Sequence, residues 1–115
     1  MDINDNYQVI FTKQSQKEIN CIYQYISKTL CAKISTLQLM KEINSKVINL
    51  TIFPRLYCEL KIPNSKGIEY RRIVVKNYIV IYRVNDRKKE IYILHIFHSK
   101  SDYQRKLYSK FFSLN

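Results

Sequence analysis

The sequence contains few residues that interrupt regular structure, with one glycine, two prolines and no tryptophan among 115 residues. Flexible linkers and disordered tails are usually rich in glycine or proline, so this composition argues against long segments of either kind. The three cysteines, Cys21, Cys31 and Cys58, lack the CxxC spacing of zinc sites, and their number is odd. We therefore expect reduced thiols in a cytoplasmic protein without a metal or cofactor.

Long apolar runs are also missing. No stretch approaches the roughly 18 residues that a membrane-spanning helix needs. The N-terminal residues MDINDNYQ have neither the basic nor the apolar region of a signal peptide. A length of 115 residues with 46% hydrophobic and 25% charged residues fits one globular domain spanning residues 1–115. We expect a small soluble protein with no membrane partner.

Acidic residues are scarce, since 9 Asp and Glu stand against 20 Lys and Arg, a net charge of +11. The excess is uneven, with +2 in residues 1–54 and +9 in residues 55–115. A field this strong and this one-sided is typical of a protein that meets a polyanion or an acidic protein partner. The simpler alternative is a basic protein that its charge keeps soluble.

The first half predicts a strand followed by two helices. YQVIFT, residues 7–12, alternates as a short strand does. Ser15 offers a helix N-cap with Glu18 at the capping-box spacing, and helical periodicity runs through residues 15–30. A second periodic segment spans residues 33–53, with an apolar side formed by Ile34, Leu37, Met40, Ile43, Val47 and Leu50. Helices joined so closely should form an antiparallel hairpin.

The second half predicts a sheet. Residues 54–68 should form a loop that can include a short strand near 57–62, and segments rich in β-branched residues follow at 69–75, 78–84 and 90–97. Residues 101–112 have helical periodicity. The order β-α-α-β-β-β-α predicts an α+β fold: an N-terminal strand, an antiparallel helical hairpin on a four-stranded, mostly antiparallel sheet, and a C-terminal helix. In strand 90–97, alternation places His95 with Ile91, Ile93 and Phe97, and leaves His98 at the strand exit.

Three stretches, in this order, make the chain resemble the RelE/ParE superfamily of bacterial type II toxin–antitoxin toxins. They are YQVIFT leading into SQKEINCIYQYI, then RRIVVKNYIVIYRVND, then IYILHIFHSKSDYQRKL. The resemblance covers nearly the whole chain and implies a toxin that an antitoxin encoded beside it neutralises. It also implies two alternative activities, because RelE-like members cut mRNA in the ribosomal A site without a metal, whereas ParE-like members poison DNA gyrase.

The RelE-like alternative needs an acid/base group and cations around one phosphate. His98 is the best acid/base candidate, and several nuclease members carry a histidine at the matching position. Arg72 and Arg83 are candidate phosphate ligands, and Tyr103 is a candidate stacking residue or acid. The further candidates for substrate binding are Lys61, Arg71, Lys76 and Lys100. For each residue, a structural or general basic role is the simpler alternative, and His95 is interpreted as structural.

One position departs from the RelE-like pattern. Many of those nucleases carry an arginine directly after the aromatic residue that opens the third strand, and Ile79 stands there in YIVIY. Three functions therefore stay open: ribosome-dependent mRNA cleavage by a metal-free endoribonuclease, inhibition of DNA gyrase, and antitoxin binding alone in a degenerate toxin. Under each of them we expect an acidic or amphipathic antitoxin that lays a helix or strand along the sheet and hairpin.

Overall fold

A computed structural model describes residues 6–26, 30–61 and 66–99 of the chain. The elements in chain order are β1 (Gln8–Phe11), α1 (Lys13–Ile26), α2 (Leu30–Ile48), the 3-10 turn η2 (Asn49–Thr51), β2 (Cys58–Leu60), β3 (Tyr70–Val75), β4 (Tyr78–Asn85) and β5 (Glu90–His98). The predicted α+β class is confirmed. The sheet has five strands instead of four, because residues Cys58–Leu60 pair with β3 as an edge strand. The helix predicted at residues 101–112 lies outside the described residues.

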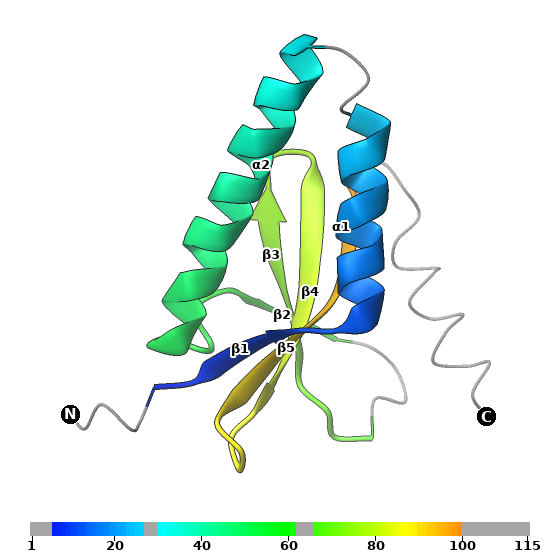
Figure 1. Cartoon of the computed structure of the whole chain (residues 1–115). Coiled ribbons are helices and arrows are strands. Elements are labelled where there is room, and N and C mark those ends of the chain that lie inside the picture. Colours follow the sequence, from blue (N-terminus) through cyan, green and yellow to red (C-terminus); the bar gives the residue numbers. More distant parts are fainter. Residues whose placement is uncertain (1–5, 27–29, 62–65, 100–115) are drawn as a thin grey trace.

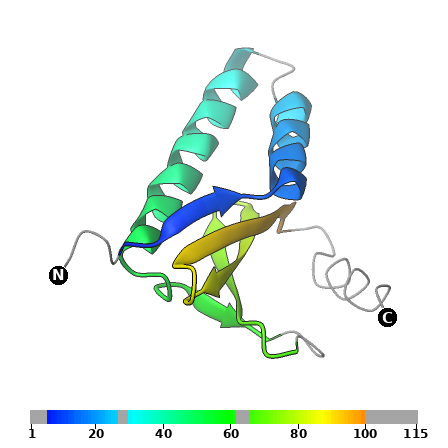
Figure 2. The ribbon, with the colours of Figure 1, turned by 60° about the horizontal axis from the view of Figure 1, so that its bottom comes forward.

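The strands lie in the order β1-β5-β4-β3-β2. β1 runs parallel to β5, and every other neighbouring pair is antiparallel. The two helices run antiparallel to each other and cover one face of the sheet (Figures 1 and 2). β4 and β5 occupy central positions, as predicted from their apolar residues on both faces.

The first helix begins at Lys13 because Thr12 caps it. Thr12 Oγ1 accepts a hydrogen bond from the Ser15 backbone N–H at 3.2 Å, and Ser15 Oγ donates to the Thr12 carbonyl at 2.8 Å. Thr12 Oγ1 also donates to the Ile93 carbonyl at 2.8 Å, which ties the start of the helix to β5. The prediction that Ser15 is the N-cap is wrong. Its hydroxyl lies buried one turn inside the helix.

The buried side of α2 differs from the predicted one at Leu37. Leu39, Ile43 and Val47 are buried, together with Leu50 in η2, whereas Leu37 is 62% exposed. A step of two residues turns the helix by about 200°, so Leu37 and Leu39 face opposite sides. The remaining predicted positions fit the buried side, apart from Ile34, whose side chain is not described.

The sheet carries an apolar cluster on each face. The cluster on the helical side joins α2 to the strands and includes Leu39, Ile43, Val47, Leu50, Ile73, Val75, Val80, Tyr82, Ile91, Ile93 and Ile96. The second cluster consists of Tyr70, Ile79, Ile81 and Phe97, with Leu60 and Leu94 packed against it. These two clusters show which face each polar side chain of the sheet occupies.

Candidate functional site

A β-bulge in β5 decides which way its last residues point. Ile81 pairs with His95 and Tyr82 pairs with Ile93, so Leu94 has no residue opposite it. An extra residue in one strand reverses the alternation beyond it. Ile96 therefore belongs to the helix-side cluster with Ile93. The prediction that His95 and Phe97 share a face with Ile91 and Ile93 is wrong, because Phe97 belongs to the second cluster.

His98 lies at the end of β5 on the helical side of the sheet. It pairs with Tyr78, and the two rings meet edge to face with centroids 5.2 Å apart. Tyr78 packs against the helix-side cluster. Together with Cys21 and Ile22 of α1, these two residues line a hollow of about 450 Å³. His98 is therefore half-buried beside α1.

Arg72 and Arg83, the candidate phosphate ligands, lie on the other face. Arg72 pairs with Ile81 and Arg83 with Tyr70 across the β3–β4 ladder, and side chains of directly opposed residues share a face. Ile81 and Tyr70 both belong to the second cluster. The Arg83 guanidinium carbon also lies 4.9 Å from the centre of the Tyr92 ring, at cation–π distance.

The structure does not bring the predicted acid/base group and phosphate ligands together. His98 is on the helical side, whereas Arg72 and Arg83 are on the opposite side of the same sheet. Arg83 is also five residues along β4 from Tyr78, the partner of His98, a separation of about 16 Å. Ile79, at the position where RelE-like nucleases carry an arginine, is only 5% exposed and fills the second cluster.

Arg71 is used to hold the fold together. Its Nε donates to the carboxylate of Glu69, and its Nη1 donates to the Tyr57 carbonyl at 2.7 Å. Glu69 also accepts from Arg55 Nε, at 3.1 Å and 3.0 Å to its two oxygens. Two guanidinium groups thus share one carboxylate at the start of β3.

Arg55, which was not among the predicted site residues, binds two carboxylates. Its Nη1 and Nη2 donate to Asp86 at 3.1 Å and 2.6 Å, and Tyr7 Oη donates to the same carboxylate at 2.5 Å. We name the set Arg55, Asp86, Glu69, Arg71 and Tyr7 the Arg55 network. A single arginine after a proline is not part of any periodic pattern. Its partners could therefore be identified only from the three-dimensional structure.

The arginines and carboxylates of this network stabilise one another's charged forms. Hydrogen bonds from Arg55 and Tyr7 hold the pKa of Asp86 below its usual value. Burial alone would raise the pKa of Glu69, but hydrogen bonds from Arg71 and Arg55 hold it below the usual value. The hydrogen bond to Asp86 raises the pKa of Tyr7. Such opposite shifts are typical of a structural ion-pair network.

His95 contacts α1. Its Nδ1 lies 3.2 Å from Glu18 Oε1, and the same carboxylate oxygen accepts a hydrogen bond from the Ile96 backbone N–H at 3.3 Å. The imidazole stacks on the Phe97 ring with centroids 5.2 Å apart. Glu18 therefore links the helix to the bulged end of β5, in place of the predicted capping box.

The remaining basic candidates are scattered. Lys76 lies in the turn between β3 and β4, with its Nζ 3.6 Å from Glu42 of α2. Lys61 is exposed directly after β2. Lys100 and Tyr103 lie outside the described residues.

Two further features concern the described residues as a whole. Among residues 6–26, 30–61 and 66–99, no three His, Cys, Asp or Glu side chains are placed to hold a metal ion. None of the helices in these ranges is long and apolar enough to cross a membrane.

Several solved structures have the same fold, and three of them are named for ParDE, RelE–RelB and RelE proteins. The chromosomal ParDE system of P. aeruginosa matches 84% of this chain and 99% of its own, with 18% identity and a TM-score of 0.64. The archaeal RelE–RelB complex of Pyrococcus horikoshii matches 83% and 97%, with 21% identity and a TM-score of 0.57. The isolated RelE toxin of E. coli matches 91% and 98%, with 14% identity and a TM-score of 0.54. No curated protein sequence matches significantly.

The sequence itself gives the family. Residues 9–103 match the family described as "ParE toxin of type II toxin-antitoxin system, parDE". This match includes both helices and all the strands except the first residue of β1. The chain therefore belongs to the ParE toxin family and is a toxin of a type II toxin–antitoxin system.

Proposed function

We propose that this toxin arrests growth by binding and inhibiting DNA gyrase, without cutting RNA. The observation that carries the proposal is the division of the candidate nuclease residues between two faces of the sheet, with His98 on one and Arg72 and Arg83 on the other. Metal-free cleavage needs the acid/base group and the cations within hydrogen-bond reach of one phosphate. Buried Ile79 supports the same conclusion, since it contributes no cation to either face.

A gyrase inhibitor needs a binding surface and no catalytic constellation. The helical hairpin lies over one face of the sheet (Figure 1), and its outer side could form such a surface. The charge of +9 in residues 55–115 favours an acidic surface on the target or the DNA that it holds. In this account the toxin acts in the cytoplasm, where its target is.

A cognate antitoxin is the second proposed partner. The P. horikoshii structure named above is a complex of RelE with RelB. The family of this chain is described by the toxin–antitoxin pair parDE. A net charge of +11 favours an acidic antitoxin, which would neutralise the toxin by covering part of its surface.

Ribosome-dependent mRNA cleavage is the second candidate function, and the hollow beside His98 favours it. Tyr78 and His98 present two aromatic rings to a space of about 450 Å³, where a nucleobase can stack. In this alternative His98 is the acid/base group. Arg72, Arg83 and Tyr103 then contact the substrate, with Lys61, Arg71, Lys76 and Lys100 in support, after a rearrangement on the ribosome.

Induction of the chain in a bacterial host separates the candidates. An SOS reporter and primer extension on an abundant mRNA are followed over the first minutes. The proposal predicts early SOS induction with intact mRNA. Cuts within translated codons before any SOS signal would establish the nuclease alternative instead. Normal growth would point to a degenerate toxin that retains antitoxin binding alone.

A further inference from the structure

The turn between β4 and β5 carries a run of basic residues at one end of the molecule. It consists of Asp86, Arg87, Lys88 and Lys89. Arg87 and Lys88 are exposed, and within the described part of the chain neither side chain has a carboxylate partner. Figure 1 shows the turn, in yellow, projecting beyond both helices. These two cations are therefore accessible to a partner.

Hydrogen bonds fix the backbone of this turn. Asn85 Oδ1 accepts a hydrogen bond from the Lys88 backbone N–H at 3.2 Å. The Lys89 N–H donates to the Asp86 carbonyl at 3.3 Å, and the Lys89 carbonyl accepts from the Gln8 N–H at 2.9 Å. The turn is therefore ordered before any partner arrives. Binding to an ordered turn costs less conformational entropy than binding to a mobile one.

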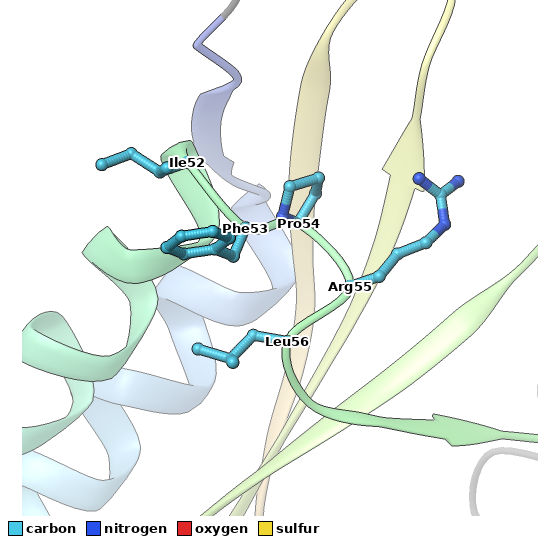
Figure 3. Close-up of a pocket in the computed structure, with 5 residues that line it drawn as sticks. All are labelled: Ile52, Phe53, Pro54, Arg55 and Leu56. Carbon is cyan, nitrogen blue, oxygen red and sulfur yellow. The ribbon is translucent and has the colours of Figure 1, made fainter.

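The carboxylate within the turn is already neutralised. Asp86 accepts hydrogen bonds from Arg55 at 2.6 Å and 3.1 Å, and from the Tyr7 hydroxyl at 2.5 Å. Figure 3 shows the Arg55 side chain pointing away from Ile52 and Leu56, and its guanidinium ends at Asp86. Asp86 therefore does not offset the positive charges that follow it in the turn.

Two more cations lie at the same end of the sheet. Arg83 is on β4 shortly before the turn, with its guanidinium packed 4.9 Å from the centre of an aromatic ring of β5. Lys66 is exposed in the loop that precedes β3. Arg55 ties this loop to the turn, because it binds both Glu69 and Asp86. We name four residues the basic end of the sheet: Lys66, Arg83, Arg87 and Lys88.

The shape and charge of this end favour one kind of polyanion. Duplex DNA carries one negative charge per roughly 1.7 Å of its axis. Its major groove, about 12 Å wide, admits a two-stranded β-ribbon. The β4–β5 turn is the end of such a ribbon. The major groove of duplex RNA is too narrow for side chains to enter, so the same turn would fit it less well.

We propose that the basic end of the sheet binds the phosphate backbone of duplex DNA, with Arg87 and Lys88 each contacting a phosphate. The setting rests on the proposed function, since gyrase holds a DNA segment that the toxin would then touch as well. DNA binding is measured without gyrase. A chain that fails to bind DNA can therefore be told apart from a chain that fails to inhibit the enzyme.

The test is a fluorescence anisotropy titration of a short labelled DNA duplex with the full chain, at several salt concentrations. The logarithm of the affinity should fall linearly with the logarithm of the salt concentration. Arg87→Gln/Lys88→Gln should bind about 10-fold or more weakly at low salt and reduce this slope by about two. The matched control is Lys17→Gln/Lys41→Gln, which removes the same charge from exposed positions on the helices and should keep the slope.

Nuclear magnetic resonance on the unaltered chain provides a readout that does not depend on a variant folding. The backbone amides of residues 85–89 should shift most when the duplex is added, and larger shifts on the helices would overturn the proposal. Equal loss of slope in the two double variants would also overturn it, because binding would then follow net charge alone. Failure of the unaltered chain to bind at low salt, or equally tight binding of an RNA duplex of the same sequence, has the same consequence.

Discussion

Arg55 and Asp86 form a two-pronged ion pair, with Nη2 to Oδ2 at 2.6 Å and Nη1 to Oδ1 at 3.1 Å. The Nε of the same arginine binds Glu69, so one side chain connects three segments: the loop after η2, the start of β3 and the turn after β4. Only the planar guanidinium can make this set of directed bonds. The geometry of the loop after η2 therefore depends on Arg55.

Replacing Arg55 by methionine should lower the free energy of unfolding by about 1 kcal/mol, since the arginine is partly exposed and solvent screens its ion pairs. Arg55→Lys should recover little of this loss, because an ammonium group cannot bind both carboxylates in the same geometry. Urea titration measures both variants. Arg87→Met, at an exposed position in the β4–β5 turn, is the control and should change stability by less than about 0.5 kcal/mol. Equal stability of Arg55→Met and the unaltered chain would refute this role.

Acid should weaken the fold through Glu69 and Asp86. Both carboxyls have folded-state pKa values below their usual ones. Their stabilising contribution is complete above the unfolded pKa values, near 4, and is lost as the pH falls through the lower folded values. The urea midpoint should therefore decline below about pH 4. The double variant Glu69→Gln/Asp86→Asn should have a lower urea midpoint at neutral pH, and its midpoint should fall less as the pH is lowered. If the midpoints of the variant and of the unaltered chain fall equally with pH, these two carboxyls do not cause the acid sensitivity.

Alkali should destabilise the fold by ionising Tyr82. This side chain is fully buried, and burial raises its pKa to about 12. Because the folded pKa exceeds the unfolded value of about 10, the contribution of Tyr82 is complete below about pH 10 and is lost as the pH rises through about 12. Ultraviolet titration should show one tyrosine ionising near pH 12, absent in Tyr82→Phe. That variant should also lose about 1 kcal/mol at neutral pH, since the Pro54 carbonyl loses its donor.

Lys76 has a positive φ of 53°, which a residue with a Cβ adopts only at a cost. Lys76→Gly should therefore be more stable than Lys76→Ala by roughly 1 kcal/mol. Both variants remove the same exposed contact with Glu42, so comparing them isolates the backbone effect. Thermal unfolding of the pair is the measurement. An alanine variant that is as stable as the glycine variant would show that the turn relaxes.

His98→Ala should keep its toxicity if the toxin binds gyrase. The substitution removes an edge-to-face contact with Tyr78, so a loss of about 0.5–1 kcal/mol in stability is expected with an intact fold. Growth arrest after induction measures the toxicity of the variant, and a thermal melting curve measures its stability. Complete loss of arrest in a folded variant would restore His98 to a catalytic role and favour mRNA cleavage.

The sequence predicted the fold well because its periodicities are strong. Alternation and β-branched residues identified the strands of the sheet, and helical spacing identified the hairpin. The start of α1 was misplaced because Thr12 and Ser15 are both good capping residues. The hydrogen bond from the Ser15 backbone N–H to Thr12 Oγ1 shows that Thr12 is at the helix end, and the bond from Thr12 to the Ile93 carbonyl holds it there.

The arrangement of the candidate site could not be predicted, because one unpaired residue reverses the alternation in β5. Leu94 is an ordinary strand residue, and nothing in the sequence around it indicates that it forms a bulge. Without the bulge, His95 would share a face with Ile93. With it, His98 points to the helical side, away from Arg72 and Arg83. The partners of Arg55 were equally hidden, since they lie 14 and 31 residues away in the sequence.

The most direct measurement is the supercoiling activity of purified DNA gyrase with increasing amounts of the purified chain. If the toxin binds gyrase, supercoiling should be inhibited at a toxin concentration comparable to that of the enzyme, and His98→Ala should inhibit equally. Full supercoiling activity at a large excess of folded toxin would show that gyrase is not its target.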